Sequence, residues 1–246
     1  MNVVSPLIIK NIEKTYDKKK VLENIDFSLN SGEIFGLIGL NGAGKTTLIK
    51  IVLDLINAEK GEAQISGIST KNISSRKNLS YLPEKFQPSR YLQGMEYLEL
   101  ALSYYGKTLD TKKAREKAVE LDLDPDVLER RVGSYSKGMG QKLGLVGAFL
   151  VDAELLILDE PMSGLDPSAR IKLKNEFLRN KKAGKTLFFS SHILSDIDEI
   201  CDRIGVIHNG KLYYIGTPSE FKQNLKEISL EQAFLRVIES EKPLAA

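Results

Sequence analysis

The sequence predicts an α/β fold in which a strand-rich core carries an inserted helical segment. Three observations lead to this prediction. Apolar residues alternate as in strands near the N-terminus, their spacing becomes helical between about residues 87 and 150, and strand-like runs return after that segment. The chain has no evident internal repeat or low-complexity linker, and its 246 residues are enough for one large domain or for a core with a smaller subdomain.

The first elements are expected to be strands that lead into a helix. The run "LIIKNI" alternates, and "VLENIDFSLN" follows it up to a turn at Asn30-Ser31-Gly32. "FGLIGL" is a short apolar run typical of a buried strand, and "GEAQISGIST" predicts a strand, a turn and a strand. Between them, "KTTLIKIVLDLI" has apolar residues at helical spacing: Leu48, Ile51, Val52 and Leu55.

Three helices are expected next, in "GMEYLELALSYYG", "TKKAREKAVELDL" and "KGMGQKLGLVGAFLV". "ELLILDEP" and "KTLFFSS" are strand-like, and "RIGVIHNGKLYYIGTP" predicts a β-hairpin with Asn209-Gly210 at its turn. The C-terminal segment has helical spacing, which allows it either to pack on the core or to mediate dimer contacts. The apolar positions are Leu230, Phe234, Val237 and Ile238.

The composition is ordinary for a soluble globular protein and excludes several kinds of site. Lys and Arg number 35 against 33 Asp and Glu, so the net charge of +2 gives no strong field, and we expect no nucleic-acid partner. A single cysteine, Cys201, excludes a disulfide framework, and we expect it to pack against the core. The two histidines, His192 and His208, are too few for a multi-histidine metal centre.

Membrane-spanning and secretory signals are not found in the sequence. No run approaches the roughly 18 apolar residues that a membrane span needs. The N-terminus lacks the basic segment and the cleavage site of a signal peptide. We therefore expect a cytosolic protein, or one that sits on a membrane through a partner.

Residues Gly39–Thr46, "GLNGAGKT", fit the pattern G-x-x-x-x-G-K-[ST]. Its glycines let successive backbone N–H groups point at a phosphate chain, and the following helix adds its positive N-terminus. Lys45 can then reach the outer phosphates, and the Thr46 hydroxyl can bind Mg²⁺. The alternative is a glycine-rich turn that binds nothing, but the predicted strand before it and helix after it favour a phosphate site.

Two apolar runs end in polar residues. "LLILDEP" delivers Asp159 and Glu160 to the carboxyl end of a strand, where α/β folds place their ligands. Asp159 would hold Mg²⁺ through water, and Glu160 would polarise a water for attack on the γ-phosphate. "FFSSHILSD" puts His192 at the same edge, where it could hydrogen-bond the γ-phosphate, whereas we interpret His208 as structural. Alone, "LLILDEP" would be a strand ending in a solvated acidic turn; beside the phosphate motif, the functional interpretation is favoured.

Together these residues resemble one family, the ATP-binding cassette (ABC) ATPases, which are the nucleotide-binding subunits of ABC transporters. The resemblance runs from about Leu7 to Lys222. "GLNGAGKTT" resembles the Walker A segment, "LLILDEP" the Walker B segment, "SGLDP" the D-loop, and His192 the switch histidine. The Walker A resemblance implies nucleotide binding by Gly39, Leu40, Asn41, Gly42, Ala43, Gly44, Lys45, Thr46 and Thr47.

The resemblance also implies a P-loop NTPase (RecA-like) core with an N-terminal antiparallel β subdomain and an inserted α-helical subdomain. The chain would be a single nucleotide-binding domain over residues 1–246. Its parts are expected at residues 1–86 and 151–222 for the core with the β subdomain, 87–150 for the helical subdomain, and 223–246 for a C-terminal helical tail.

Two residues outside the phosphate motif are assigned to nucleotide binding by the resemblance. Tyr16 in "EKTY" resembles the aromatic residue that stacks on adenine, with an ordinary half-buried tyrosine as the alternative. Asp166 belongs to the D-loop, and it also suits an N-cap because Pro167 follows at the first helical position.

"YSKGM", Tyr135–Met139, resembles the signature loop of the family, usually written LSGGQ. In the family this loop contacts the ATP bound by a second subunit, so two cassettes enclose two nucleotides head to tail. Ser136 as an N-cap, followed by Lys137, Gly138 and Met139, would present backbone donors and a helix dipole to that ATP. In isolation, the same segment would be an exposed helix cap with no ligand.

Two departures from the family pattern resemble the drug- and polymer-exporting cassettes of bacteria. Lys137 and Met139 stand where the signature has Gly and Gln, and Glu84 in "YLPEKF" stands where the Q-loop has glutamine. Glu84 is assigned to the metal set with Thr46 and Asp159, with coupling to a membrane partner as the alternative role.

The expected function is an ATP-binding and ATP-hydrolysing subunit with ATP and Mg²⁺ as cofactors. It would form a dimer, with a homodimer favoured, and power a separately encoded transmembrane permease from the cytoplasmic face of the membrane, for export. The stretch from about Gln87 to Tyr105 would offer the groove for the partner's coupling helix. Two alternatives remain: a soluble cassette that acts on nucleic acid, ribosomes or metal-cluster assembly, and a regulatory subunit that does not hydrolyse ATP.

Overall fold

The computed structural model describes residues 4–240, which form ten β-strands, eight α-helices and three short 3-10 helices. The strands are β1 (Leu7–Tyr16), β2 (Lys19–Ser28), β3 (Ile34–Ile38), β4 (Lys60–Ile65), β5 (Ile68–Ser69), β6 (Leu79–Leu82), β7 (Leu155–Asp159), β8 (Thr186–Ser191), β9 (Arg203–His208) and β10 (Lys211–Gly216). The α-helices are α1 (Lys45–Val52), α2 (Gly94–Ser103), α3 (Thr111–Glu120), α4 (Lys137–Leu150), α5 (Pro167–Lys182), α6 (Leu194–Ile200), α7 (Pro218–Leu225) and α8 (Leu230–Ser240). The 3-10 helices are η1 (Ile73–Arg76), η2 (Pro125–Glu129) and η3 (Val132–Ser134). Across this described range no helix has the length and apolar character needed to cross a membrane.

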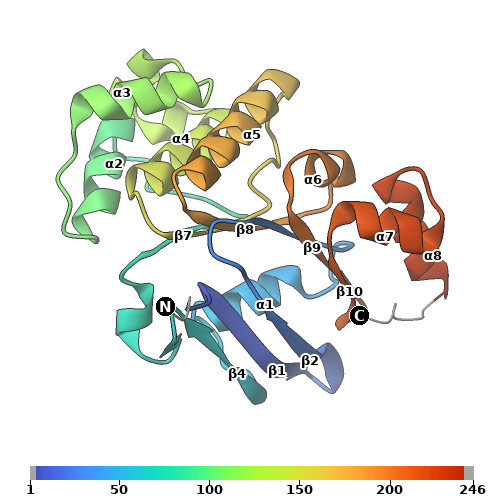
Figure 1. Cartoon of the computed structure of the whole chain (residues 1–246). Helices are drawn as coiled ribbons and strands as arrows, with labels where there is room; N and C mark the ends of the chain where they lie inside the picture. The colour runs from blue at the N-terminus through green and yellow to red at the C-terminus, as the bar shows by residue number, and fades with distance from the viewer. Residues whose placement is uncertain (1–3, 241–246) are drawn as a thin grey trace.

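The strands form two sheets (Figure 1). The smaller sheet has the order β2-β1-β4-β5 and is antiparallel. The larger has the order β10-β9-β3-β8-β7-β6 and is parallel except for β10, which forms the predicted hairpin with β9. Together they confirm the predicted α/β fold class, with a mostly parallel core sheet and an antiparallel sheet.

Both faces of the larger sheet are apolar, because helices cover one face and α1 with the small sheet covers the other. Along β7, Leu155 and Ile157 contribute to the hydrophobic cluster shared with α1 and the small sheet. Leu156 and Leu158 contribute to the cluster shared with α4, α5 and α6. This alternation is the period of two that a strand imposes on its side chains. A parallel sheet buried on both faces therefore explains the uninterrupted apolar run.

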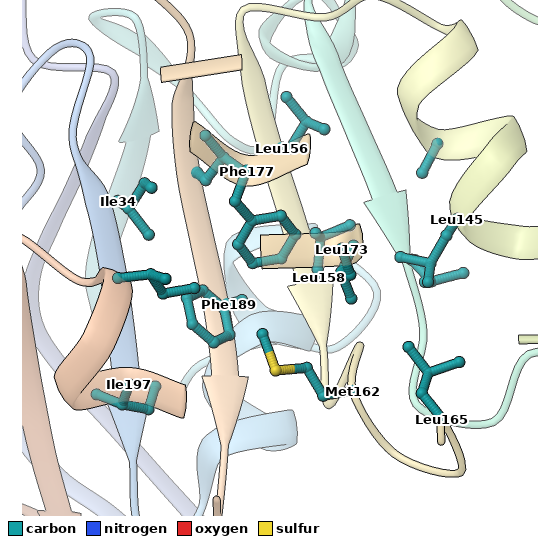
Figure 2. Packing of buried hydrophobic residues seen from close by; sticks show 14 of the residues in the cluster. Ile34, Leu145, Leu156, Leu158, Met162, Leu165, Leu173, Phe177, Phe189 and Ile197 are labelled. Carbon is teal, nitrogen blue, oxygen red and sulfur yellow. The ribbon is translucent and has the colours of Figure 1, made fainter. Parts of the chain in front are cut away.

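The helical side of the sheet is packed by aromatic and aliphatic side chains (Figure 2). Phe189 of β8 meets Phe177 of α5 edge to face, with ring centroids 5.1 Å apart. Leu158, Met162 and Ile197 belong to the same buried cluster. Fully burying a side chain of this kind stabilises the fold by about 1.5–3 kcal/mol. The packing fixes β7 and β8, whose carboxyl ends carry the polar residues considered below.

The three helices predicted between residues 87 and 150 are present as α2, α3 and α4. They lie beyond the larger sheet from the small antiparallel sheet, next to α5 (Figure 1). Helix α4 packs against both α2 and α3. Gly144 of α4 permits close packing on β6, since an added Cβ there would lie 2.7 Å from the Leu82 side chain.

Helix α1 is shorter than its apolar spacing indicates. It ends at Val52, and Leu55 is 60% exposed, whereas the three other apolar positions are buried. Asp54 has a φ of 56°, its N–H donates to the Ile51 carbonyl, and the Leu55 N–H donates to the Lys50 carbonyl. These two bonds and the left-handed residue form a Schellman cap. Because Asp54 takes the position that Gly usually occupies, the end of the helix could not be predicted from the sequence.

The C-terminal segment packs on the core. Helix α8 buries Leu230, Ala233, Phe234 and Val237 in the cluster that also contains α6, and it contacts α6 and α7. The predicted helical spacing is therefore confirmed, and of the two arrangements it allowed the structure shows the first. The expected tail extends to residue 246, and its last six residues lie outside the described range.

Cys201 and His208 have the structural positions expected of them. Cys201 packs against the main core, and burial raises the pKa of its thiol well above the ordinary value. His208 is buried, and its ring meets Tyr213 edge to face at a centroid distance of 5.7 Å. Neither residue lines the cleft described below.

Candidate functional site

Residues 39–46 connect the carboxyl end of β3 to α1, and glycine is required at two of these positions. An added Cβ at Gly39 would lie 2.4 Å from the Ile207 carbonyl oxygen, so the loop approaches β9 more closely than a side chain allows. Gly44 is the N-cap of α1 and has a φ of 108°, which disfavours any other residue. The turn aims the N-terminus of α1, with its positive end of the helix dipole, into the loop.

The Lys45 side chain folds back over this loop. Its Nζ donates to the carbonyl oxygens of Gly39 at 2.8 Å and Leu40 at 3.4 Å, and it lies 3.3 Å from Glu160 Oε1. Only 6% of Lys45 is exposed. A phosphate beside the loop would offer the ammonium a stronger, charge-assisted partner than the two carbonyls.

Asp159 and Glu160 follow β7 and are held by a serine from the neighbouring strand. The register of β7 and β8 places Asp159 opposite Ser190. Ser190 Oγ donates to Asp159 Oδ1 at 2.5 Å and accepts from the Glu160 N–H at 2.9 Å. One hydroxyl therefore fixes the first carboxylate and the backbone of the second.

One oxygen of Asp159 is suited to bind a cation. Asp159 is fully buried, and within the described chain its Oδ2 has no hydrogen-bond partner. Burial raises the pKa of Asp159, the Ser190 and Thr46 hydroxyl groups oppose that rise, and the charges of Glu84 and Glu160 add to it. A divalent cation would remove the desolvation cost of this buried carboxylate.

The residues at this site suit Mg²⁺, which takes few protein ligands, better than a metal ion that the protein must ligate completely. Across residues 4–240 no group of three or more His, Cys, Asp or Glu side chains is arranged to hold a metal ion. Mg²⁺ usually takes one or two protein ligands and completes its shell with phosphate oxygens and water. Thr46 and Asp159 provide such a partial shell, since the Thr46 side chain lies near enough to Asp159 to lower its pKa.

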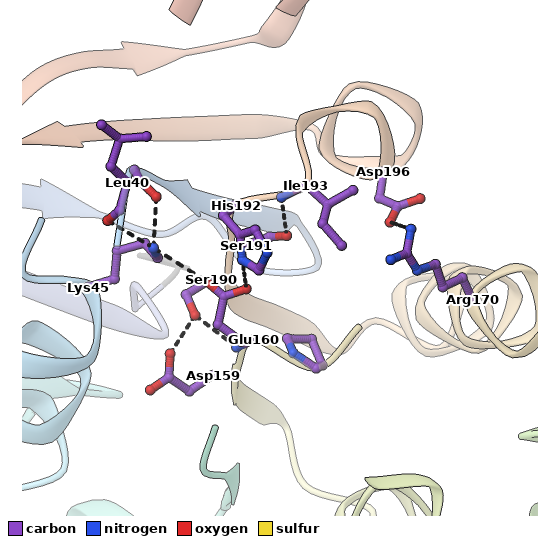
Figure 3. A network of polar contacts seen from close by, with 12 residues as sticks. Leu40, Lys45, Asp159, Glu160, Arg170, Ser190, Ser191, His192, Ile193 and Asp196 are labelled. Carbon is purple, nitrogen blue, oxygen red and sulfur yellow. Dashed lines mark hydrogen bonds and ion pairs between the residues drawn. The ribbon is translucent and has the colours of Figure 1, made fainter. Parts of the chain in front are cut away.

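Glu160 is the central member of a three-residue contact chain with Lys45 and His192 (Figure 3). His192 Nδ1 lies 2.7 Å from Glu160 Oε2, while Lys45 approaches the other carboxylate oxygen. Glu160 is 7% exposed, whereas the His192 side chain is 47% exposed. The histidine therefore joins a buried carboxylate to the surface of the molecule.

A cleft of about 380 Å³ lies beside the phosphate loop. It brings Tyr16 and Glu84 together with the loop, as the sequence predicts. Tyr16 ends β1 and is 46% exposed; the next two residues, Asp17 and Lys18, both have positive φ, as in a type I′ hairpin turn. The lining residues are Tyr16, Val21, Leu40, Asn41, Gly42, Gly44, Lys45, Thr46, Thr47, Glu84 and Glu160.

A second cleft, of about 440 Å³, is larger but contains none of the predicted site residues. It lies between α3 and α5, and Glu176 at its base pairs with both Lys117 and Arg179. Because these charges neutralise one another, the cleft next to the phosphate loop is the better candidate site.

The signature segment lies outside the phosphate cleft. Ser136 is the N-cap of α4, and its Oγ accepts from the Met139 N–H at 3.2 Å, as predicted. An added Cβ at Gly138 would lie 3.1 Å from the Gly164 carbonyl oxygen. Asp166 is the predicted N-cap of α5, accepting from the Ala169 N–H at 3.0 Å. Among the predicted nucleotide-binding residues, those that do not line the cleft are Gly39, Ala43, Ser136, Lys137, Gly138, Met139 and Asp166.

Two residues at the site were not assigned from the sequence. Val21 lines the cleft beside Tyr16 only because of the register of the β1–β2 hairpin, which local spacing does not reveal. Ser190 had a weak signal, since it is a polar residue at the end of an apolar strand, but its role depends on β8 lying beside β7.

Comparison with known proteins gives a consistent result. A profile of the family described as "ABC transporter" matches residues 22–163. The chain is 37% identical over 230 residues to an uncharacterized ABC transporter ATP-binding protein of Nostoc sp., covering 89% of this chain and 68% of that protein. It is 34% identical over 242 residues to the ABC-type transporter ATP-binding protein EcsA of Bacillus subtilis, covering 95% of this chain and 97% of EcsA. One solved structure, of an ATP-binding subunit of an ABC transporter, matches with a TM-score of 0.86 at 32% identity, covering 95% of this chain and 99% of that one.

Proposed function

This chain belongs to the ABC transporter family as an ATP-binding ATPase cassette, and on that basis we propose that it works as a dimer around two ATP molecules and powers a separate transmembrane permease. The observation that carries the catalytic part of the proposal is the contact chain of Lys45, Glu160 and His192, of which Lys45 and Glu160 line the cleft.

Glu160 is the proposed general base. It is buried, and both of its carboxylate oxygens face a basic group, so its side chain is fixed where the two neighbours converge. When Lys45 turns to the outer phosphates of ATP, Glu160 Oε1 becomes available to accept a hydrogen bond from the attacking water. His192 keeps the second oxygen in place and can donate to the γ-phosphate from its exposed side.

Nucleotide binding is assigned to the loop and to Tyr16. The backbone of residues 39–47 would surround the phosphates, and the Tyr16 ring at the mouth of the cleft would stack on the base. Mg²⁺, when bound, neutralises charge on the phosphate oxygens. Thr46 and Asp159 are the residues proposed to hold it, with Glu84 at the edge of the cleft as a third member.

The proposed dimer is supported by the position of the signature segment. Ser136, Lys137, Gly138 and Met139 begin α4 away from the chain's own cleft. Their helix N-terminus can bind an anion only if that anion comes from outside the chain, and a second cassette arranged head to tail would supply it. Asp166 would approach the nucleotide from the same side.

The remaining parts of the proposal rest on family resemblance. The permease would be separately encoded, and the protein would bind it at the cytoplasmic face of the membrane, with export as the direction. Residues 1–86 and 151–222 would act as the core with its β subdomain, residues 87–150 as the helical subdomain, and residues 223–246 as the tail.

Replacing the base tests this proposal. Glu160→Gln keeps the size of the side chain but removes its charge, so ATP turnover should fall by roughly 10²–10⁴-fold. ATP binding, measured by calorimetry in the presence of Mg²⁺, should persist. Phosphate release measures turnover, at protein concentrations high enough for a dimer to form.

Glu154→Gln is the matched control, because Glu154 is an exposed residue just before β7. It should leave turnover unchanged. Undiminished turnover in Glu160→Gln would exclude Glu160 as the base, and a wild-type protein that binds ATP but releases no phosphate would exclude the proposed enzyme.

A further inference from the structure

The segment that joins Glu160 to α5, residues 161–166, contacts α4 at both ends and in its middle; we call it the connecting segment. At its start, Gln141 Nε2 donates to the Pro161 carbonyl oxygen at 3.1 Å. At its end, Lys142 Nζ donates to Asp166 Oδ2 at 3.3 Å. Two adjacent residues of one helix therefore hold both ends of the segment that follows the proposed base.

The middle of the connecting segment also touches α4. An added Cβ at Gly138, in the first turn of α4, would lie 3.1 Å from the Gly164 carbonyl oxygen. Gly164 itself has a φ of 75°, and an added Cβ there would contact the Lys137 side chain at 3.5 Å. The segment is thus packed on the first two turns of α4, the turns that carry the signature residues.

Lys142 also contacts a residue outside the connecting segment. Besides Asp166, its Nζ donates to the backbone oxygen of Asp122 at 2.9 Å and to Asp122 Oδ2 at 3.0 Å. Lys142 is 9% exposed, whereas the Asp122 side chain is 26% exposed and the Asp166 side chain 54% exposed, so a buried ammonium is paired with carboxylates that reach the surface. A single ammonium thus joins α4, the residues after α3 and the N-terminus of α5.

The hydrogen bond between Gln141 and Pro161 acts on the proposed base through the backbone. Pro161 directly follows Glu160, and Glu160 has a φ of 50°, an uncommon conformation for a residue with a side chain. Such a conformation persists only when its surroundings determine it. The hydrogen bond from Gln141 fixes the carbonyl group of Pro161, the residue after Glu160, and Ser190 accepts from the Glu160 N–H on the other side.

From these contacts we propose that Gln141 and Lys142 are positioning residues, through which the signature end of α4 sets the position of Glu160 in the same chain. The proposal rests on the proposed function, since it assumes that ATP held by a second copy binds the start of α4. A helix moves as a rigid body over one or two turns, so a displacement of Ser136 by that ATP displaces Gln141 and Lys142 as well. The connecting segment follows them, and the base is carried into or out of place.

Substitutions on α4 test the proposal by separating turnover from binding. Lys142→Met removes the ammonium but keeps a side chain of similar length, and Gln141→Leu removes the donor. Each should lower kcat for ATP about tenfold or more and leave KM within about twofold. Lys142→Arg keeps the charge and should retain at least half of the wild-type kcat.

Asp122→Asn is the matched control. It removes one ionic partner of Lys142 but leaves the Asp166 contact intact, and Asp122 lies outside the cleft. Its thermal midpoint should fall by about as much as that of Lys142→Met, while its kcat stays within about twofold of wild type. Hydrogen–deuterium exchange adds a local measurement: amides of residues 162–166 should exchange at least tenfold faster in Lys142→Met and Gln141→Leu than in Asp122→Asn.

The outcomes separate this inference from the proposed function. Wild-type protein that hydrolyses ATP, together with unchanged kcat in the two α4 variants, would overturn the positioning role alone. Equal losses of kcat in Asp122→Asn and Lys142→Met would also overturn it, since the effect would then follow general stability. Should Lys142→Met fail to fold, Gln141→Leu decides alone: normal kcat and normal exchange in residues 162–166 would contradict the proposal.

Discussion

Glu160 combines an uncommon backbone conformation with a buried side chain whose two oxygens each lie near a basic group. A residue with a side chain at positive φ costs roughly 1–2 kcal/mol relative to the right-handed region. The cost is offset by the hydrogen bond from its N–H to Ser190 and by the contacts of its carboxylate with Lys45 and His192. Strain of this kind concentrates at functional sites, where the orientation of one group matters more than local stability.

Ser190→Ala should damage the site more than its size suggests. The change leaves the Glu160 N–H and Asp159 Oδ1 unpaired in a buried region, which costs about 1–3 kcal/mol per group. We expect a lower free energy of unfolding in urea and a kcat for ATP at least tenfold below wild type.

Ser191→Ala provides the comparison for that experiment. Among residues 4–240, Ser191 Oγ accepts from the Ile193 N–H at 3.0 Å and has no hydrogen bond to Asp159 or Glu160. Its loss should cost about 1 kcal/mol of stability and leave kcat within twofold. A Ser190→Ala enzyme that is no slower than Ser191→Ala would show that Ser190 does not fix the carboxylates.

At the residue scale, the sequence predicted those groups whose chemistry is carried by a local motif. Lys45, Asp159, Glu160 and His192 all follow apolar runs, and the structure places them at the carboxyl ends of β3, β7 and β8. Ser190 was visible only as a polar strand end. Its partnership with Asp159 is made by the lateral order of strands, a tertiary property that no local spacing records.

Helix α4 carries the signature residues as well as Gln141 and Lys142. Gly138, in its first turn, has little room for a side chain. Gly138→Asp would place a Cβ 3.1 Å from the Gly164 oxygen and a carboxylate at a helix end that is proposed to face a triphosphate. We expect hydrolysis to fall at least tenfold, while ATP binding by the single chain is retained. Phosphate release and calorimetry with ATP measure the two quantities, and Ser136→Arg should behave in the same way.

Gly140→Ala is the control within the same helix. An added Cβ at Gly140 meets no atom within 4 Å, and Ala favours a helix over Gly by about 1 kcal/mol. This variant should be more stable to heat and keep its turnover. Normal turnover in Gly138→Asp would mean that the signature segment does not face a nucleotide.

Element types were predicted better than element ends. Apolar spacing predicted α2, α3 and α4, and the Asn-Gly turn predicted the β9–β10 hairpin. The end of α1 was missed because Asp54 takes the left-handed position that Gly usually marks. The apolar spacing predicted the C-terminal helix, but only the structure shows that this helix packs on the core against α6.

The stability of the whole molecule should depend on pH through carboxylates whose pKa is lowered in the fold. A hydrogen bond from Lys172 lowers the pKa of Asp122 below 3.8, one from Lys185 does so for Asp152, and the Ala169 N–H does so for Asp166. Because these groups bind protons more weakly when folded, their contribution is fully present above the unfolded pKa and is lost as pH falls through the folded values.

Urea unfolding at a series of pH values checks this expectation. The free energy of unfolding should be steady above about pH 5 and should fall from there towards pH 3. Asp159 acts in the opposite direction, since burial raises its pKa and protonation then favours the folded state. Asp152→Asn should make the acid-induced loss smaller. A free energy that rises as the pH is lowered from 5 to 3 would contradict the assignment.

At the scale of the molecule, the sequence predicted the α/β class but not the order of the strands. The order β9-β3-β8-β7-β6 brings together segments far apart in the chain, and no local pattern states which strand lies beside which. The family resemblance supplied the architecture instead. The hydrogen bonds from Gln141 and Lys142 to the connecting segment could not be predicted from the sequence either, because they depend on how that segment packs against α4.

The position of β3 between β8 and β9 has a consequence for how the protein is made. The Gly32 N–H donates to Thr186 Oγ1 across 154 positions, so the strand that leads into the phosphate loop leaves the ribosome long before either neighbour exists. At about 5–20 residues per second, the wait is roughly 8–30 s. During this interval the apolar run "IFGLI" has no sheet to join, and a nascent chain halted before residue 186 should bind chaperones that recognise apolar segments but should not bind ATP.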